Sequence, residues 1–266
     1  MIVNFFLDNR IGGPHVYSKY IEENINEKFF DITCGKSNFS KYHLIDLKKK
    51  IRYLFIFEVI INIFEIIKIK EIKKSSTFFV YSIYNIAPIL AGIILKKKIL
   101  WFLVEDINFF SIIIFKIINF FYKIKIICIN NDIARKLKIK NYKVHLPNID
   151  TIFWSRKKTI SKPNKKITIS LVGNINKTKN YKQFLNFFEN IQGPIKINII
   201  GEILKNQLNY YNNLKNLKIF LKRKLVKIVF HGRKNEKFIK KILNETDIYF
   251  LPSISEGTSI SLIQAM

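Results

Sequence analysis

Short runs of β-forming residues alternate with longer helical patterns along almost the whole sequence. This alternation is typical of βαβ units built around a parallel sheet. In the first half, strands are predicted over residues 2–7, 30–34, 42–47, 78–82, 99–104, 124–129 and 143–146. In the second half, strands are predicted over 167–172, 195–200, 227–230 and 248–251, with helices over 182–190, 204–223 and 236–244. The sequence therefore predicts an α/β fold.

A break in the alternation divides the chain. Residues 147–166 hold two prolines and a basic run and have no clear period, which is typical of a linker. A chain of 266 residues, 48% of them hydrophobic, is long enough for two domains. We predict Rossmann-like domains over 1–150 and 167–266, joined by a linker over 151–166. The last predicted helix starts near Thr258 and reaches Met266 after about two turns, so we expect the second domain to be incomplete.

The formal net charge of +27 raises the question of a polyanionic partner. Only six of the 46 basic residues are arginine, the side chain that reads base edges best, and no nucleic-acid-binding motif is present. We therefore expect no specific nucleic-acid partner. A positive surface would attract an anionic membrane, but the wealth of Lys, Ile, Asn and Phe is equally explained by an AT-rich genome, and both explanations stay open.

Two apolar segments, 51–67 and 107–129, imitate membrane spans. Their interior charges are Arg52, Glu58, Glu65, Lys116, Lys123 and Lys125. A charge at mid-span costs about 2.5 to 3.5 kcal/mol on insertion scales, so we predict buried amphipathic helices instead.

The N-terminal residues and the cysteines indicate the cellular compartment in which the protein is found. The first residues lack a basic region and meet Asp8 early, which is typical of a strand rather than a signal peptide. Cys34 and Cys128 each lie in an apolar run, as buried free thiols do. We expect a cytoplasmic protein that can also lie on the inner face of the membrane.

The stretch 249–266 places a buried strand, a small-residue turn and a helix start in succession. Ligands of open α/β sheets bind beyond the carboxyl ends of the strands, and a helix N-terminus suits a phosphate. Gly257 allows close approach of the backbone, Thr258 or Ser259 can cap the helix, and Glu256 can hydrogen-bond a polyol. An ordinary strand-to-helix turn with a solvated glutamate explains these residues equally well.

This stretch resembles the Glu-x7-Glu signature of the retaining glycosyltransferases of family 4, which have the GT-B fold and belong to the glycosyl transferases group 1. The matching residues are Pro252, Ser253, Glu256, Gly257, Ala265 and Met266. The resemblance implies two Rossmann-like domains facing a cleft, and transfer of a sugar from a nucleoside diphosphate sugar to a hydroxyl acceptor with retention, in the synthesis of surface polysaccharide or glycolipid. It implies that Glu256 acts on the donor sugar and that the following amides, from Gly257 to Ser259, hold the diphosphate.

Gln264 stands where the family has the second glutamate, which grips the ribose hydroxyls. An amide forgoes the charge-assisted bond, which is about twice as strong as a neutral one. We therefore expect weaker nucleotide affinity or reduced activity.

A second match follows the strand 167–172. Gly173 and Lys179 resemble the family's glycine and diphosphate-binding lysine, while Asn174 replaces the usual arginine. Gly201 matches the end of the family's next strand. Solvated lysines in a basic loop are the alternative explanation from the residues alone.

In the N-terminal half, Gly12 and Gly13 follow the first strand and resemble the family's glycine-rich loop on the acceptor side of the cleft. Glu105 and Asp106 end another strand where the family often has His-Asp, the histidine lying near the reacting sugar. We count Glu105 and Asp106 as candidate catalytic residues. A tight βα turn and an acid that complements a helix dipole are the plain alternatives.

No pair of histidines or cysteines has metal-binding spacing, and no complete phosphate-binding loop of an ATPase is present. We predict no metal site and no cofactor beyond the donor substrate. The expected partners are the nucleotide-sugar donor, a saccharide or lipid-linked acceptor, and an anionic membrane surface. The alternatives are an inactive truncated remnant, since Asn174, Glu105 and Gln264 depart from the family, a basic membrane-surface protein, and a related two-domain epimerase.

Overall fold

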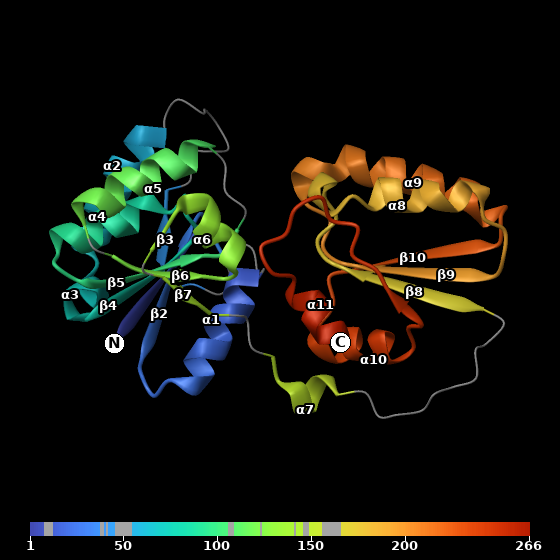
Figure 1. Cartoon of the computed structure of the whole chain (residues 1–266), viewed down its shortest axis with the longest axis horizontal. Helices are drawn as coiled ribbons and strands as arrows, with labels where there is room; N and C mark the ends of the chain where they lie inside the picture. The colour runs from blue at the N-terminus through green and yellow to red at the C-terminus, as the bar shows by residue number, and fades with distance from the viewer. Residues whose placement is uncertain are drawn as a thin grey trace. The chain divides into compact units, whose positions relative to one another are not determined.

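The chain folds into two compact units, residues 1–148 and 149–266, each with a parallel sheet (Figure 1). This computed structural model describes residues 1–7, 13–37, 40, 42–45, 55–105, 109–122, 124–140, 142–145, 149–155 and 166–266. All strand pairs in both sheets are parallel, which confirms the α/β prediction.

The described residues of the first unit form a seven-stranded sheet of order β3-β2-β1-β4-β5-β6-β7. The strands are β1 (Ile2–Phe6), β2 (Phe29–Cys34), β3 (Tyr42–Leu44), β4 (Thr77–Tyr81), β5 (Lys98–Leu103), β6 (Lys125–Cys128) and β7 (Lys143–Val144). Each falls on a predicted strand. The strand order reverses direction after β3, as in doubly wound folds.

Helices cover both faces of this sheet, as in other doubly wound folds. One face carries α1 (Gly13–Asn24), whose Tyr17 packs with Tyr81 and Phe102. The opposite face carries α2 (Phe55–Lys68), α3 (Lys70–Lys74), α4 (Ile86–Ile94), α5 (Phe109–Phe121) and α6 (Asn131–Leu137). The reversal of strand order therefore sorts the helices into two layers.

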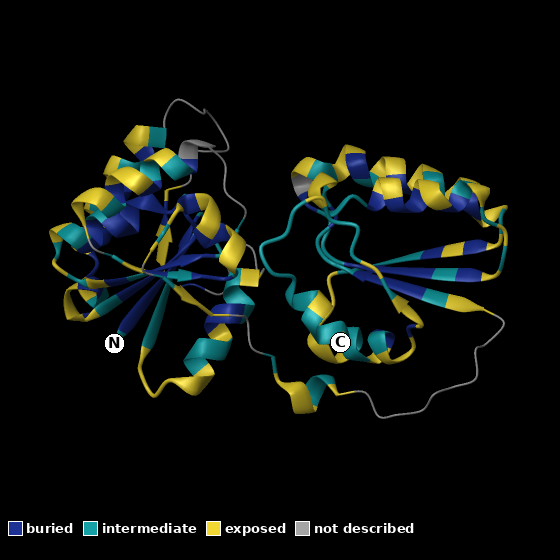
Figure 2. Cartoon of the chain, in the orientation of Figure 1, coloured by how far each residue is buried: buried dark blue, intermediate teal, exposed yellow. Residues whose placement is uncertain are grey.

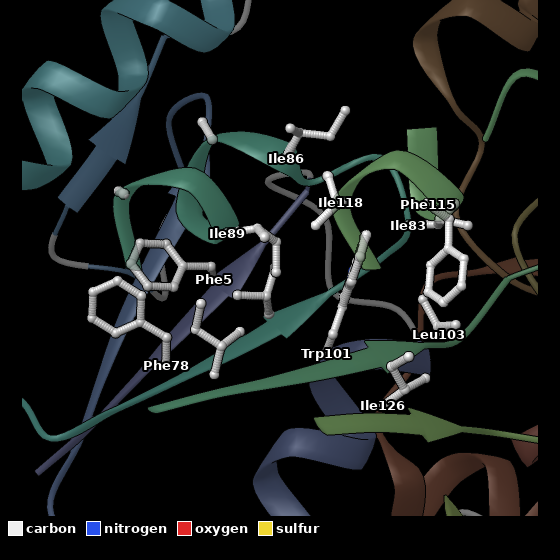
Figure 3. Close-up of a cluster of buried hydrophobic side chains, with 14 of the residues drawn as sticks. Phe5, Phe78, Ile83, Ile86, Ile89, Trp101, Leu103, Phe115, Ile118 and Ile126 are labelled. Carbon is white, nitrogen blue, oxygen red and sulfur yellow. The ribbon is translucent and has the colours of Figure 1, made fainter. Parts of the chain in front are cut away.

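The larger core lies between the sheet and the second helix layer (Figure 3). Phe5, Phe78 and Trp101 from three neighbouring strands meet Ile89 of α4 and Phe115 of α5. The indole N–H of Trp101 donates to the Ser82 carbonyl at 2.9 Å, so the largest buried side chain also has its polar atom satisfied.

The helices α2 and α5 correspond to the two apolar segments that imitate membrane spans. Their inner faces are buried in the core, but their outer faces expose large apolar side chains. The prediction of buried amphipathic helices is therefore wrong for the outer faces, because no further described element covers this helix layer. Among the described residues, no helix is both long enough and apolar enough to cross a bilayer.

The described residues of the second unit form a four-stranded sheet of order β10-β9-β8-β11. The strands are β8 (Ile167–Val172), β9 (Ile195–Ile200), β10 (Val226–Gly232) and β11 (Ile248–Tyr249). The helices are α7 (Thr151–Trp154), η2 (Lys177–Lys179), α8 (Tyr181–Asn186), η3 (Phe187–Asn190), η4 (Lys205–Gln207), α9 (Leu208–Lys222), α10 (Glu236–Asn244) and α11 (Ile260–Ala265). The four predicted strands are all present, and the helix predicted over 182–190 consists of α8 followed by the 3₁₀ turn η3.

The short helix α7 lies in the range predicted as linker. The Asp150 carboxylate caps it by accepting from the Phe153 N–H at 2.9 Å. The Lys240 ammonium lies 4.9 Å from the centre of the Phe153 ring, so α7 packs on α10. Residues 156–165 of the predicted linker lie outside the described residues.

Candidate functional site

The carboxyl ends of β8, β9 and β10 are tied together by backbone hydrogen bonds. Gly173 N–H donates to the Ile200 carbonyl at 2.9 Å, and Gly201 N–H donates to the Gly232 carbonyl at 3.0 Å. A Cβ atom on Gly201 would lie 1.9 Å from the Gly173 carbonyl oxygen, a separation that no side chain tolerates. Only glycine at position 201 permits this approach, so the loops after β8 and β9 form one rigid base.

The loop after β8 is held in place from several sides. The Asn176 side chain caps η2 by accepting from the Lys179 N–H at 3.0 Å. The Tyr181 hydroxyl donates to the Gly173 carbonyl at 2.8 Å, and the Ile254 N–H donates to the Thr178 carbonyl at 2.9 Å. The position of Lys179 is therefore determined by its own loop and by the segment after β11.

Lys179 forms an ion pair with Glu256. The two residues are far apart in sequence, and their side chains are only 19% and 27% exposed. Lys179 comes from the loop after β8 and Glu256 from the loop after β11, and these two strands are neighbours in the sheet. The arrangement places a cation and a carboxylate together beyond the carboxyl ends of parallel strands, where α/β folds bind ligands.

The start of α11 is anchored to the same edge. The Ser261 hydroxyl donates to the Val172 carbonyl at 3.1 Å and accepts from the Tyr249 hydroxyl at 2.8 Å. Burial raises the pKa of Tyr249 to about 12, so this phenol stays a neutral donor. Gly257, Thr258 and Ser259, the predicted diphosphate-binding residues, join Glu256 to the anchored helix.

Ser253 also belongs to this segment. Its hydroxyl oxygen is buried and has no hydrogen-bond partner among the described residues. Buried polar atoms are nearly always paired in native proteins, so an unpaired one needs an explanation. The sequence signal for Ser253 was the proline-serine pair of the motif, but no role was predicted for it.

Asn174 and Gln264, two of the three residues that depart from the family pattern, lie at different places in the second unit. Asn174 directly follows Gly173, on the base formed by the loops after β8 and β9, with its backbone nitrogen 3.0 Å from where a Cβ on Gly201 would lie. Gln264 of α11 lines a separate cavity of about 500 Å³ against α7 and α10. Neither Lys179 nor Glu256 lines this cavity, so the structure does not bring Gln264 together with the ion pair.

In the first unit, Glu105 lies two residues beyond the end of β5. Its carboxylate accepts hydrogen bonds from the Ser82 hydroxyl and, at 3.1 Å, from the Ile83 N–H, so it is bound to the loop after β4. Gly13 begins α1 at the same edge of the sheet, because all strands are parallel. The predicted residues Gly12 and Asp106 lie outside the described residues.

Ser82 was not predicted as a site residue. It is a non-glycine residue with a φ of 89°, and such strain persists only where the surroundings enforce it. Its hydroxyl donates to Glu105 and its carbonyl accepts from Trp101. No local sequence signal marks this role, because the sequence pattern predicts only that Ser82 is the last residue of a strand.

Within the described part of the chain, no three His, Cys, Asp or Glu side chains gather in a way that could hold a metal ion.

Residues 153–266, nearly all of the second unit, match the sequence profile of the family described as Glycosyl transferases group 1. No curated protein matches the chain in sequence. Among solved structures, Anabaena HepE in complex with UDP and glucose is similar with a TM-score of 0.78 at 9% identity, covering 100% of this chain and 78% of HepE.

Two further solved structures have the same fold. Sucrose-phosphate synthase from Thermosynechococcus elongatus has a TM-score of 0.71 at 10% identity, with 99% of this chain and 78% of that chain covered. A glycosyltransferase from Rickettsia africae ESF-5 has a TM-score of 0.68 at 14% identity, with 99% and 76% covered. The chain thus resembles the GT-B glycosyltransferases in fold, and its second unit matches the glycosyl transferases group 1 family.

Proposed function

We propose that the chain is a glycosyltransferase that moves a sugar from a nucleoside diphosphate sugar to a hydroxyl acceptor with retention of anomeric configuration. The single observation that carries the proposal is the Lys179–Glu256 pair beyond the carboxyl ends of β8 and β11. The family match over the same residues and the likeness of the fold to a UDP-bound structure support it.

In the proposed site, Lys179 holds the diphosphate. A lysine ammonium is a compact cation that offsets the charge of a leaving diphosphate, and electrostatic stabilisation of this kind is usually the largest contribution to catalysis. The backbone of Gly257, Thr258 and Ser259 supplies N–H donors beside it. Gly173 and Gly201 carry no Cβ, so the backbones after β8 and β9 approach closely, and the Lys179 side chain lies over the Gly173 backbone.

Glu256 orients the donor sugar. A carboxylate accepts hydrogen bonds from two sugar hydroxyls, and fixing the reactants in this way lowers the entropic part of the barrier. The Ser253 hydroxyl in the same segment, which has no hydrogen-bond partner among the described residues, is proposed to bond a polar group of the donor. When the donor binds, Lys179 changes its partner from the Glu256 carboxylate to the diphosphate.

The remaining predicted roles are kept as part of the proposal. Asn174 replaces one of the cations that the family uses, so Lys179 carries more of the diphosphate charge. Gln264 contacts the ribose of the donor only if a movement of α11 takes the Gln264 side chain out of the cavity that this residue lines. Glu105, which is hydrogen-bonded to the loop after β4, is proposed to act with Asp106, Gly12 and Gly13 on the acceptor side of the reaction.

We further propose a saccharide or lipid-linked acceptor, a role in surface polysaccharide or glycolipid synthesis, and a place in the cytoplasm at the inner face of the membrane. The high positive charge supports contact with an anionic membrane. The scheme requires no metal, since Lys179 and backbone N–H groups offset the diphosphate charge.

A thermal-shift titration tests the proposal. The whole chain is melted with UDP, GDP, ADP and CMP and with their sugars, because a ligand of the native state raises the melting temperature by mass action. One nucleotide family is expected to give a shift. Lys179→Ala is expected to reduce the shift from both the nucleotide and its sugar, and Glu256→Ala to remove the extra shift that the sugar adds.

Lys182→Ala is the matched control, since Lys182 is an exposed lysine of the neighbouring helix α8. It is expected to leave all shifts unchanged. A chain that melts cooperatively but responds to no nucleotide would refute the proposal and favour the inactive remnant. Release of free nucleotide from the nucleotide sugar without an acceptor product would favour an epimerase.

A further inference from the structure

The outer side of the second helix layer in the first unit is apolar. We define the α2–α5 face by its exposed residues, which are Ile56, Phe57, Ile60, Ile61 and Phe64 of α2, Ile94 at the end of α4, and Ile113, Ile117, Phe120 and Phe121 of α5. Phe120 and Phe121 are 83% and 69% exposed. Figure 2 shows exposed residues along the outer turns of both helices.

These residues recur at helical spacing, so each helix presents a continuous apolar stripe. The two helices share one core cluster with α4, which is buried along most of its length and contacts α2. The stripes therefore lie on one side of one layer. Single exposed apolar side chains are normal on a protein surface, but ten large ones exposed on one helix layer indicate a binding surface.

The helix α2 is apolar on both faces, and two of its polar residues are buried. Its polar residues Glu58 and Asn62, one turn apart, face inward and are buried. The Asn62 side chain accepts from the Ile45 N–H and donates to the Ile45 carbonyl, both at 2.9 Å, and so fastens the end of β3. With the polar residues used inside, isoleucine and phenylalanine occupy the outer positions.

Lysines border the α2–α5 face. The helices run antiparallel to the strands, so the C-terminal ends of α2, α4 and α5 meet at the amino edge of the sheet. The described lysines at or just beyond these ends are Lys68, Lys70, Lys73, Lys74, Lys96, Lys97, Lys98 and Lys125, and Lys116 lies within α5. The ammonium of Lys97 donates to the carbonyls of Lys73 at 3.1 Å and of Ser75 at 2.6 Å, which joins two of these segments.

Acidic residues are scarce along this border. Besides the buried Glu58, the described acids of α2, α3, α4 and α5 are Glu65, which pairs with Lys68 at 3.1 Å, and Glu71. A surface of phenylalanine and isoleucine bordered by an excess of positive charge is complementary to anionic headgroups with acyl chains beneath them. It is not complementary to a second copy of the chain, because two molecules of net charge +27 repel each other.

We propose that the α2–α5 face docks the first unit on an anionic lipid surface, with the two helices lying in the plane of the interface. The aromatic and aliphatic side chains enter the headgroup region and the lysines contact the phosphates. Glu105 and Gly13 lie at the opposite, carboxyl edge of the sheet, so docking leaves that edge open. The proposal does not depend on the transferase activity.

Flotation of the full chain with vesicles tests the proposal. Vesicles of phosphatidylcholine alone are compared with equimolar phosphatidylcholine and phosphatidylglycerol. The double variant Phe120→Ser/Phe121→Ser removes apolar contact and is expected to weaken binding to anionic vesicles by at least about tenfold. The double variant Lys96→Gln/Lys98→Gln is expected to weaken it about fivefold for each lysine.

Matched controls come from the second unit. Phe187→Ser removes a phenylalanine that is 70% exposed on η3, and Lys218→Gln/Lys222→Gln removes two lysines of α9. Both are expected to leave vesicle binding unchanged, and all variants are expected to melt within a few degrees of the parent chain. Raising the salt from about 0.1 M to about 1 M is expected to weaken binding, because the Debye length falls from about 10 Å to about 3 Å.

Several results would overturn the proposal. These are equal binding to neutral and anionic vesicles, no binding to either, or equal losses in the Phe187→Ser control and the Phe120→Ser/Phe121→Ser variant. A concentration-dependent dimer in sedimentation velocity that the phenylalanine variant abolishes, without any vesicle binding, would assign the face to self-association instead.

Discussion

The substitution Gly201→Ala is expected to break the base of the candidate donor site. The added methyl would lie 1.9 Å from the Gly173 carbonyl oxygen, 2.5 Å from its carbonyl carbon and 3.0 Å from the Asn174 nitrogen. All three are backbone atoms, which cannot turn away as a side chain does. The loops after β8 and β9 must therefore separate.

The size of the stability loss follows from the contacts that this separation of the two loops disturbs. Overpacking of a tight interior typically costs about 1 to 3 kcal/mol. Separation also weakens the bonds from Gly173 N–H to Ile200, at 2.9 Å, and from Ile175 N–H to Glu202, at 2.8 Å, each contributing about 0.5 to 1.5 kcal/mol. The expected loss is about 2 to 6 kcal/mol, or roughly 8 to 24 °C in the melting temperature of a unit of this size.

Differential scanning calorimetry measures this loss, and Gly232→Ala provides the comparison. A methyl at Gly232 meets open space, but its φ of +67° strains any other residue by about 1 to 2 kcal/mol. Gly201→Ala should therefore melt lower than Gly232→Ala and should also lose nucleotide-induced stabilisation. A Gly201→Ala chain that melts within about 2 °C of the parent, a shift well under 1 kcal/mol, would refute the reasoning.

Three further predictions concern single contacts. Ser261→Ala removes the bonds to Val172 and Tyr249 and is expected to lower the unfolding free energy by about 1 to 2 kcal/mol in urea denaturation, whereas no change would mean that the start of α11 is held by other contacts. Asn176→Ala removes the cap of η2 and is expected to cost about 1 kcal/mol and to weaken nucleotide binding, which calorimetric titration measures; unchanged binding would separate the cap from the position of Lys179. Burial and the neighbouring Asp31 carboxylate raise the pKa of Glu22, so ionisation favours the unfolded chain, and the stability from this group is full at low pH and lost as pH rises through the raised pKa. Glu22→Gln is accordingly expected to melt higher than the parent at neutral pH, with the difference shrinking toward pH 4, and a lower melting temperature at neutral pH would contradict this.

The strands of both units were predictable because most of them are short, largely apolar runs between turn residues, as Thr77–Tyr81 is. That Lys179 and Glu256 lie close together could be predicted, because both residues follow parallel strands whose carboxyl ends meet at one edge of the sheet. The two glycines at 173 and 201 were also marked by the sequence, although their mutual approach was not. That approach depends on the spacing of two strands that lie far apart in the chain.

Other features had no local signal. The burial of Glu58 and Asn62 reverses the usual pattern of a surface helix, because Asn62 is needed at the end of β3. Periodicity alone cannot tell which face of an apolar helix points inward when both faces contain isoleucine. The role of Ser82 depends on contacts with Glu105 and Trp101, which only the folded sheet brings near.

The most direct test of the donor site is calorimetric titration of the parent chain, Lys179→Ala, Glu256→Ala and Lys182→Ala with the preferred nucleoside diphosphate and its sugar. Loss of a bond to a charged group costs about 1.5 to 3 kcal/mol, or roughly tenfold to 100-fold in affinity. We predict this loss for both ligands in Lys179→Ala, for the sugar nucleotide alone in Glu256→Ala, and for neither in Lys182→Ala. Equal affinities in the parent chain and in Lys179→Ala would contradict the assignment of the site.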